Sequence, residues 1–215
     1  MSDFNKQKTL IIIGAGGHGK VVADCAEEMA CYHEIFFLDG RAPDLNNCGV
    51  WTVIDQPQNF LDYNQENVDF FVAIGENSSR KKWLTKLIKS DVNVATLIHP
   101  KTVISKHVLV KKGSLICANA TINAFTQIGI GCIVNTAASI DHDCFIDDFV
   151  HIAPGNSIAG TVTIEQLCFV GIGSSIIQGV TLGESSIIGA GSVVIKNIAE
   201  NTLAVGCPAK PIKKL

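Results

Sequence analysis

The chain has 215 residues, a mass of 22.9 kDa and a formal net charge of -3 with a pI near 6.0. This length allows one large or two small domains, and the slightly acidic balance gives no basic footprint for nucleic acid. No apolar run approaches the roughly 20 residues of a membrane span, and the polar start MSDFNKQK does not resemble a signal peptide. We therefore expect a soluble cytoplasmic protein with no membrane span and no nucleic-acid partner.

The first part of the chain alternates predicted strands and helices. An apolar run at 8–13 predicts a strand, glycines follow at 14–19, and apolar spacing from Val21 to Met29 predicts a helix. Further strands are expected at 34–38 and 68–74, followed by a basic helix at about 79–89. This alternation favours a small, Rossmann-like parallel sheet whose ligand crevice lies at the carboxyl ends of its strands. We expect this α/β domain to span residues 1–97.

The glycine-rich segment at 14–19 carries a phosphate-binding pattern. Gly14, Gly16 and Gly19 satisfy G-x-G-x-x-G, and Asp39 follows at the end of the second predicted strand. Such glycines let backbone N–H groups and a helix N-terminus approach a phosphate. The α/β part is too short for the usual six-stranded NAD domain, and His18 interrupts the loop. Nucleotide-sugar binding is favoured, with a structural turn or an NAD site as alternatives.

From Ile98 to Val194 an aliphatic residue occupies every sixth position. This period predicts a chain wound into a triangular coil, with one short strand and one corner in each hexad and the aliphatics inside. Residues two positions before each aliphatic, such as Cys144, are expected to point inward. Corners with positive φ are expected at the glycines that follow the aliphatic, namely Gly129, Gly171, Gly183 and Gly189. We expect the coil and a C-terminal tail to fill residues 98–215.

His142 is the candidate base of this coil. Three hexads make one coil, so residues eighteen positions apart should be neighbours. His142 is flanked by Asp141 and Asp143 and falls on an outward position, where a carboxylate can orient an imidazole and make it more basic. One coil further on, Gly160 offers a backbone N–H with no side chain in the way. A base beside an amide donor suits acyl transfer. A surface histidine with solubilising aspartates is the alternative.

Two further residues of the coil are candidates for the acyl-donor site. His151, half a coil beyond His142, is expected either to contact the donor or to be a structural histidine. Asn135 points outward and is expected to hold a histidine or the donor. The eight cysteines contain no C-x-x-C pair, so we expect reduced thiols rather than a metal site or disulfides.

The chain resembles the left-handed β-helix, hexapeptide-repeat acyltransferases that acetylate bacterial sugars, in the branch with an N-terminal nucleotide-sugar domain. The motifs that carry this likeness are GAGGHG at 14–19, FLDG at 37–40, AIGEN at 73–77, VNTAASIDHDC at 134–144, HIAPGNSIAG at 151–160, VGIGSS at 170–175, IGAGSVV at 188–194 and GCPAK at 206–210. The chain is most similar to enzymes that use acetyl-CoA to N-acetylate a UDP-4-amino-4,6-dideoxy-N-acetylhexosamine for bacillosamine-type glycans and protein glycosylation. Sialic acid O-acetyltransferases share this branch and are the alternative.

The resemblance implies a role for each matching residue. His142 corresponds to the general base, with Asp143 where relatives often have glutamate. The residues implied to bind the nucleotide sugar are Gly16, Gly17, His18, Asp39, Gly40, Gly75, Asn77 and Arg80. The residues implied to bind acetyl-CoA are His151, Gly160, Ile172 and Ala190. Asn135 is added to the acetyl-CoA residues because of its outward position in the coil. A homotrimer with its acetyl-CoA groove between subunits is also implied. We expect direct transfer without an acyl-enzyme, because Cys144 falls at an inward position, and we expect no metal.

Two other functions are compatible with a coil of this type. Zinc shared between subunits through His107, His142 and His151 would support hydration of carbon dioxide. A non-catalytic assembly or sugar-binding module would use the coil as a scaffold. An outward His142 between two aspartates disfavours the scaffold, which has no need of it.

Overall fold

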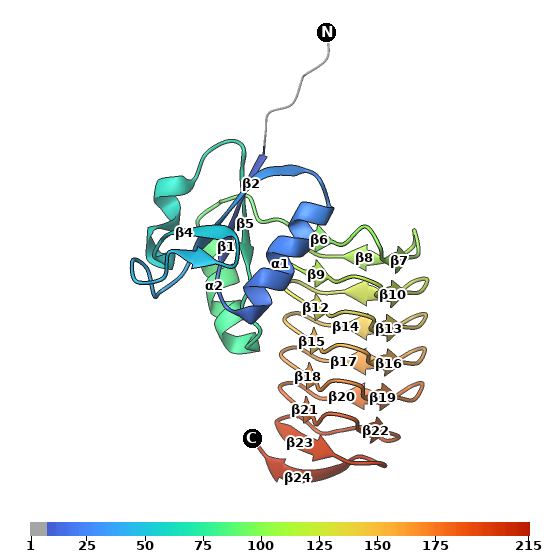
Figure 1. The fold of residues 1–215 in the computed structure, drawn as a ribbon. Helices are drawn as coiled ribbons and strands as arrows, with labels where there is room; N and C mark the ends of the chain where they lie inside the picture. The colour runs from blue at the N-terminus through green and yellow to red at the C-terminus, as the bar shows by residue number, and fades with distance from the viewer. Residues whose placement is uncertain (1–7) are drawn as a thin grey trace. The chain divides into compact units, whose positions relative to one another are not determined.

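The computed structural model describes residues 8–215, which form two compact units that meet in the sequence between Leu97 and Ile98. The first is an α/β unit and the second a stack of coils (Figure 1). The polar start, expected not to be a signal peptide, lies outside the described residues except for Lys8. No helix in the described part of the chain is long and apolar enough to cross a membrane.

The α/β unit is a five-stranded sheet with two α-helices. Its elements are β1 (Lys8–Ile13), α1 (Gly17–Glu28), β2 (Tyr32–Leu38), β3 (Asn47–Cys48), β4 (Trp51–Asp55), the 3-10 helix η1 (Pro57–Tyr63), β5 (Val68–Val72) and α2 (Asn77–Lys89). The strand order is β3-β4-β2-β1-β5, parallel except for the β3–β4 hairpin. The parallel sheet expected from the alternating pattern is therefore present.

Buried runs explain strands β1 and β5 of this sheet. All five residues of β5 and the last four of β1 are buried, as expected for strands covered on both faces. Helix α2 begins at Asn77, two residues earlier than predicted, because the Glu76 carboxylate accepts hydrogen bonds from the N–H groups of Ser78 and Ser79 and so caps the helix. Strands β3 and β4 and helix η1 were not predicted.

The second unit is built almost entirely from two-residue strands. These are β6 (Leu97–Ile98), β7 (Val103–Ile104), β8 (Leu109–Val110), β9 (Leu115–Ile116), β10 (Thr121–Ile122), β11 (Gln127–Ile128), β12 (Ile133–Val134), β13 (Ser139–Ile140), β14 (Phe145–Ile146), β15 (His151–Ile152), β16 (Ser157–Ile158), β17 (Thr163–Ile164), β18 (Phe169–Val170), β19 (Ser175–Ile176), β20 (Thr181–Leu182), β21 (Ile187–Ile188) and β22 (Val193–Val194). The C-terminal β23 (Thr202–Val205) and β24 (Lys210–Lys214) form an antiparallel hairpin.

The short strands stack into three parallel sheets, one on each face of the coil. The first sheet runs β7-β10-β13-β16-β19-β22, the second β8-β11-β14-β17-β20, and the third from β6 through β9, β12, β15, β18 and β21 to the C-terminal hairpin. Paired residues are eighteen positions apart, as in Ile140 with Ile158. The expected spacing of one coil per three hexads is thus confirmed.

The periodic aliphatics fill the interior of the coil. Those from Ile116 to Val194 are at most 3% exposed, and the small residues two positions before them are also buried, Cys144 included. Both inward positions of each hexad are therefore buried between residues 114 and 194, and the burial pattern predicted from the repeat is confirmed.

The expectation of positive φ at Gly129, Gly171, Gly183 and Gly189 is wrong. Left-handed backbone occurs instead two residues later in the hexad, at positions such as Phe125, Asp143 and Gly191. The four glycines serve close packing: a Cβ added at Gly171 would lie 2.6 Å from the backbone nitrogen of Ala190 on the next coil. Glycine is needed there because successive coils approach closely, not because of its own φ.

Candidate active site

His142 lies at the corner between β13 and β14, with more than half of its side chain exposed. Its Nδ1 is 2.8 Å from Oδ2 of Asp143. Asp143 occupies the left-handed position of its hexad, with φ of 56°, a conformation that aspartate tolerates better than most residues. The structure therefore pairs the two residues that the sequence placed side by side.

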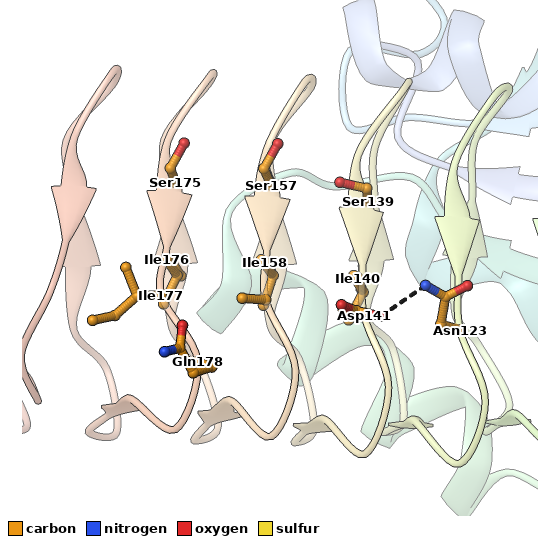
Figure 2. A pocket seen from close by; sticks show the side chains of 11 residues that line it. Asn123, Ser139, Ile140, Asp141, Ser157, Ile158, Ser175, Ile176, Ile177 and Gln178 are labelled. Carbon is orange, nitrogen blue, oxygen red and sulfur yellow. Dashed lines mark hydrogen bonds between the residues drawn. The ribbon is translucent and has the colours of Figure 1, made fainter.

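Asp141 fixes the backbone of the same corner. Its Oδ1 accepts hydrogen bonds from the His142 N–H at 2.9 Å and from Nδ2 of Asn123 at 2.8 Å, the second of which is dashed in Figure 2. The hydrogen bond to Asp143 raises the pKa of His142, and the charge of Asp141 adds to this effect. When Nδ1–H donates to Asp143, the neutral imidazole has its lone pair on Nε2. Such a group is a proton acceptor that faces away from Asp143.

Gly160 lies against the imidazole on the next coil. A Cβ added at Gly160 would be 2.6 Å from Cε1 and 2.7 Å from Nε2 of His142, so only glycine admits this ring position. The Thr161 N–H donates to the carbonyl of His142 at 2.9 Å and joins the two coils at this point. Within residues 8–215, no hydrogen bond is found for the Gly160 N–H. The expected juxtaposition of an imidazole and an amide donor is therefore present.

Cys144 lies close in sequence to His142 but faces the interior. It is 2% exposed, and its Sγ donates to the carbonyl of Ala159 at 3.2 Å. Burial raises the pKa of this thiol. A buried, protonated thiol is a poor nucleophile, which disfavours a covalent cysteine intermediate.

The residues predicted to bind acetyl-CoA lie at two different corners of the coil. Asn135, Ile172 and Ala190 lie between the third and first sheets, whereas Gly160 lies with His142 between the first and second. His151 belongs to β15 of the third sheet. It is 9% exposed, and its ring contacts Nδ2 of Asn135 at 3.4 Å. The structure brings Asn135 to His151, as one of its two predicted roles required, and does not bring His151 to His142.

A ladder of polar side chains runs inside the corner that carries Ile172 and Ala190. The Ser174 N–H donates to Oδ1 of Asn156 at 3.1 Å, the Ser192 N–H to Oγ of Ser174 at 3.3 Å, and the Gly206 N–H to Oγ of Ser192 at 3.1 Å. The side chains of Asn156, Ser174 and Ser192 are buried at the small inward position on successive coils. The ladder fixes the backbone of this corner through to the GCPAK segment.

A groove of about 410 Å³ lies on the first sheet, between these two corners. Figure 2 shows Ser139, Ser157 and Ser175 in a row on β13, β16 and β19, with Asp141 near one end of the groove. These serines were not predicted as site residues. Their spacing of eighteen, one position before the buried isoleucine, is a signal that could have identified them.

The glycine-rich loop of the α/β unit joins β1 to α1 and is tied to Asp39 at the end of β2. Oδ2 of Asp39 accepts from the Ala15 N–H at 2.7 Å, and Arg41 donates from Nε to Oδ1 of Asp39 at 2.8 Å and from its guanidinium to the Ala15 carbonyl at 3.0 Å. The hydrogen bond from Arg41 is the main reason that the pKa of Asp39 is lowered to about 2.

The predicted phosphate-loop residues line the start of α1. Gly16 and Gly17 are exposed there, and His18 is half-buried. Gly40 is exposed beside Asp39, and a Cβ added to it would meet no atom within 4 Å apart from its neighbours in the chain. These positions are therefore open to a ligand, and their contact with a nucleotide sugar stays a prediction.

The guanidinium of Arg80 is buried and hydrogen-bonded to the protein itself. Arg80 is 1% exposed, and its guanidinium donates to the carbonyls of Ile74 and Gly75 at 3.0 Å and to Oδ1 of Asn77 at 2.7 Å. Arg80 therefore shapes the loop after β5, while Gly75 and Asn77 form that loop. Direct contact of these three residues with a nucleotide sugar stays a prediction.

The three histidines of the zinc hypothesis do not meet within the described chain. His107 stacks on Phe125 with ring centroids 5.1 Å apart, and His142 and His151 lie on different parts of the coil. Residues 8–215 contain no group of three or more His, Cys, Asp or Glu side chains that could hold a metal ion.

Sequence comparison relates this chain to sugar N-acetyltransferases. Residues 9–87 match the PglD N-terminal domain family. The chain is 33% identical over 102 residues to GDP-perosamine N-acetyltransferase of Escherichia coli O157:H7, covering 47% of this chain and 46% of the relative. It is 34% identical over 113 residues to UDP-N-acetylbacillosamine N-acetyltransferase of Bacillus subtilis (strain 168), covering 52% of each. The matched segment thus spans about half the length of these curated relatives.

Solved structures match over almost the whole chain. The acetyltransferase domain of PglB from Neisseria gonorrhoeae FA1090, solved also in complex with acetyl coenzyme A, is 36% identical with a TM-score of 0.92, covering 96% of this chain and 100% of that domain. PerB from Caulobacter crescentus, in complex with CoA and GDP-perosamine, is 32% identical with a TM-score of 0.88, covering 95% and 97%. These matches confirm the expected fold, an α/β unit followed by a left-handed parallel β-helix. The chain belongs to the family of hexapeptide-repeat sugar acetyltransferases with a PglD-type N-terminal domain.

Proposed function

We propose that this chain transfers the acetyl group of acetyl-CoA to the 4-amino group of a nucleotide-linked 4-amino-4,6-dideoxy sugar in bacterial glycan biosynthesis. The observation that carries the proposal is the His142–Asp143 pair facing Gly160 on the next coil. The names of the relatives, N-acetyltransferases of GDP-perosamine and UDP-N-acetylbacillosamine, support an amine acceptor rather than the hydroxyl of a sialic acid. Because these names include both GDP and UDP, the expected UDP group stays a prediction.

His142 acts as the general base in this proposal. The 4-amino group is largely protonated near neutral pH, and it must lose a proton before its nitrogen attacks the thioester carbonyl. Nε2 of His142 accepts that proton, and the carboxylate of Asp143, bonded to Nδ1, stabilises the imidazolium. When the tetrahedral intermediate collapses, the C–S bond breaks, the proton held by His142 passes to the departing thiolate, and the amide nitrogen releases its second proton to solvent. The products are the amide and coenzyme A, without a covalent enzyme intermediate.

The Gly160 N–H supplies the second part of the chemistry. As the amine adds to the thioester, negative charge develops on the carbonyl oxygen. A backbone donor that makes no other hydrogen bond in the described chain is available to that oxygen, and a fixed donor needs little reorganisation. Because the Cα of Gly160 lies against the imidazole, this donor and the base are close enough to act on the same reacting carbon.

We further propose that the acetyl-CoA site is completed by a neighbouring subunit of a homotrimer. The predicted donor residues are divided between two corners of one chain, and the groove between those corners lies on the outer face of a sheet, which supplies one wall. A second subunit would supply the other wall. Val103, Leu109 and Phe125 lie at or beside the corner between the first and second sheets and each expose more than 60% of their surface, as expected for a region that another chain covers.

The α/β unit is proposed to hold the acceptor. Gly16, Gly17 and His18 begin α1, where backbone N–H groups and the helix dipole favour a diphosphate. Asp39 and Arg41 border the same loop. Both substrates are cytoplasmic metabolites in this proposal, and we place the enzyme in the cytoplasm.

One experiment tests the proposed function directly. The purified protein is incubated with acetyl-CoA and, in separate reactions, UDP- and GDP-linked 4-amino-4,6-dideoxy sugars, CMP-sialic acid and free sialic acid, while thiol release is followed. Acetylation of an amino sugar nucleotide is expected. Turnover of sialic acid alone, or no transfer to any amino sugar, would contradict the proposal.

A further inference from the structure

A second cavity lies in the α/β unit, and none of the nucleotide-sugar residues expected from the sequence lines it. Its volume is about 450 Å³, and its lining includes Asn46, Asp55, Gln56 and Asn59. We propose that this pocket holds the base of the nucleotide sugar and selects bases with a lactam edge, uracil or guanine, over adenine and cytosine. The proposal rests on the proposed function, because it assigns the base of that acceptor.

The pocket lies where a nucleoside would extend from the phosphate loop. Asp39 follows β2 and Asp55 ends β4, and these strands are neighbours in the sheet. The Asp39 N–H donates to the carbonyl of Asp55 at 3.0 Å, so the two strand ends are joined directly. Ligands of open parallel sheets bind outside the carboxyl ends of the strands. A diphosphate at the start of α1 therefore directs its ribose past Asp39 and its base toward Asp55.

Asp55 presents a fixed carboxylate to the pocket. It accepts hydrogen bonds from the Gln56 N–H at 2.6 Å, from Nδ2 of Asn59 at 3.0 Å and from the hydroxyl of Tyr63 at 3.1 Å. These bonds, the first above all, lower the pKa of Asp55, so the group is ionised at neutral pH. A carboxylate offers about four lone-pair sites, and the three bonds leave one acceptor site for a ligand.

Asn46 supplies the complementary group. Its side chain is exposed on the turn before β3, lines the pocket, and makes no hydrogen bond within the described residues. A carboxamide can donate from its NH₂ group and accept at its oxygen. Gln56 closes the other side of the pocket, since its Nε2 donates to the carbonyl of Ala42 at 2.8 Å.

A lactam edge matches this combination of an ionised acceptor and an amide. Uracil and guanine each carry a ring N–H beside a carbonyl oxygen, so the N–H can donate to Asp55 while the carbonyl accepts from Asn46. Adenine and cytosine have a ring nitrogen lone pair in place of that N–H. Their lone pair would face the carboxylate, an unfavourable contact that rejects these bases. Contacts in this pocket thus discriminate between nucleotide bases, which contacts with the phosphate loop alone cannot do.

The test is equilibrium binding by calorimetry, with UDP, GDP, CDP and ADP as probes and with the full chain as wild type, Asn46→Ala and Asn47→Ala. Asn47 is the matched control: it is adjacent and exposed, but it does not line the pocket. Wild type is expected to bind UDP or GDP at least about 10-fold more tightly than CDP and ADP, a difference of about 1.4 kcal/mol. Asn46→Ala should reduce that preference several-fold, whereas Asn47→Ala should not change it.

The outcomes separate this inference from the proposed function. Equal affinity for all four nucleotides, or an unchanged preference in a folded Asn46→Ala protein, overturns the pocket assignment even if amino-sugar acetylation is measured. Absence of both nucleotide binding and acetyl transfer instead contradicts the proposed function. Asp55→Asn serves as a second variant, because asparagine keeps the oxygen that accepts from Gln56 but loses the charge. It is expected to relax the rejection of CDP and ADP.

Discussion

The imidazole of His142 lies directly against Gly160 of the next coil, where a Cβ would be 2.6 Å from Cε1 and 2.7 Å from Nε2. The ring is held from its other side by Asp143, 2.8 Å from Nδ1. Asp143 thus orients the imidazole, and Gly160 leaves space for it. In the proposed mechanism, both contacts keep Nε2 directed toward the reacting amine.

Gly160→Ala is expected to reduce kcat by roughly 100-fold or more, because the new methyl group displaces the imidazole from its position beside the amide donor. The melting temperature should change little, since the half-exposed ring can turn into solvent. Steady-state kinetics and thermal unfolding measure the two effects. Lys196→Ala, at an exposed position two coils further along the same corner, is the control and should retain activity. Near-normal turnover in Gly160→Ala would show that this contact is not part of catalysis.

His142→Ala is expected to lower kcat by about 100-fold or more while the coil remains folded, because the proton acceptor is lost and the side chain makes no buried contact. Circular dichroism and sedimentation report the fold, and thiol release reports turnover. A folded His142→Ala protein with nearly full turnover would exclude His142 as the base.

Asp143→Asn is expected to shift the acidic limb of the kcat profile to lower pH. The bond to Asp143 is the largest cause of the raised pKa of His142, so its weakening moves that pKa back toward the ordinary value of 6.5. A base with a lower pKa is neutral, and therefore active, at lower pH, although maximal kcat should fall because the ring is less well oriented. Asp141→Asn, which removes the second cause, should give a smaller shift in the same direction.

The same pKa shift has a consequence for stability. Because the folded-state pKa of His142 is raised above its unfolded value, the interaction with Asp143 stabilises the protein below pH 6.5 and is lost as pH rises through the folded pKa. NMR titration of the His142 ring in wild type and Asp143→Asn measures the shift. Identical titration midpoints would contradict the electrostatic role of Asp143.

Asp39→Ala is expected to raise the KM for the nucleotide sugar and leave the KM for acetyl-CoA unchanged. The substitution removes the acceptor that holds the Ala15 N–H and Arg41, and so loosens the loop that precedes α1. Asp44→Ala is the matched control, because Asp44 is an exposed carboxylate in the following turn. Equal increases in both KM values would indicate a general structural defect, and tight NADH binding would favour the dinucleotide alternative.

Activity is expected to follow the fraction of trimer during dilution, because one chain supplies only one wall of the proposed acetyl-CoA groove. Sedimentation velocity and initial rates are measured over the same concentration series. A fully active monomer at assay concentration would contradict both the trimer and the placement of Ile172 and Ala190 at the donor.

The sequence determined the coil and the juxtaposition at its proposed centre. A period of six fixes which residue of each hexad faces inward, and eighteen residues per coil fix which residues become neighbours. For that reason the positions of His142 and Gly160 could be predicted from the spacing alone. The strand, glycine turn and helix at the start of the chain were predictable for a similar reason, because their signals are local.

The tertiary structure decided those features of the fold and the site that no periodic sequence pattern predicts. The segment that forms β3, β4 and η1 has no clear repeat, and its strands depend on pairing with β2, so the pocket lined by Asp55 could not be predicted. Burial of Arg80 depends on how α2 packs. The pairing of Asp143 with His142 depends on a left-handed backbone at a corner, which hydrogen bonds between successive coils impose. Sequence spacing sets which residues are neighbours, whereas the packed chain sets where their side chains point.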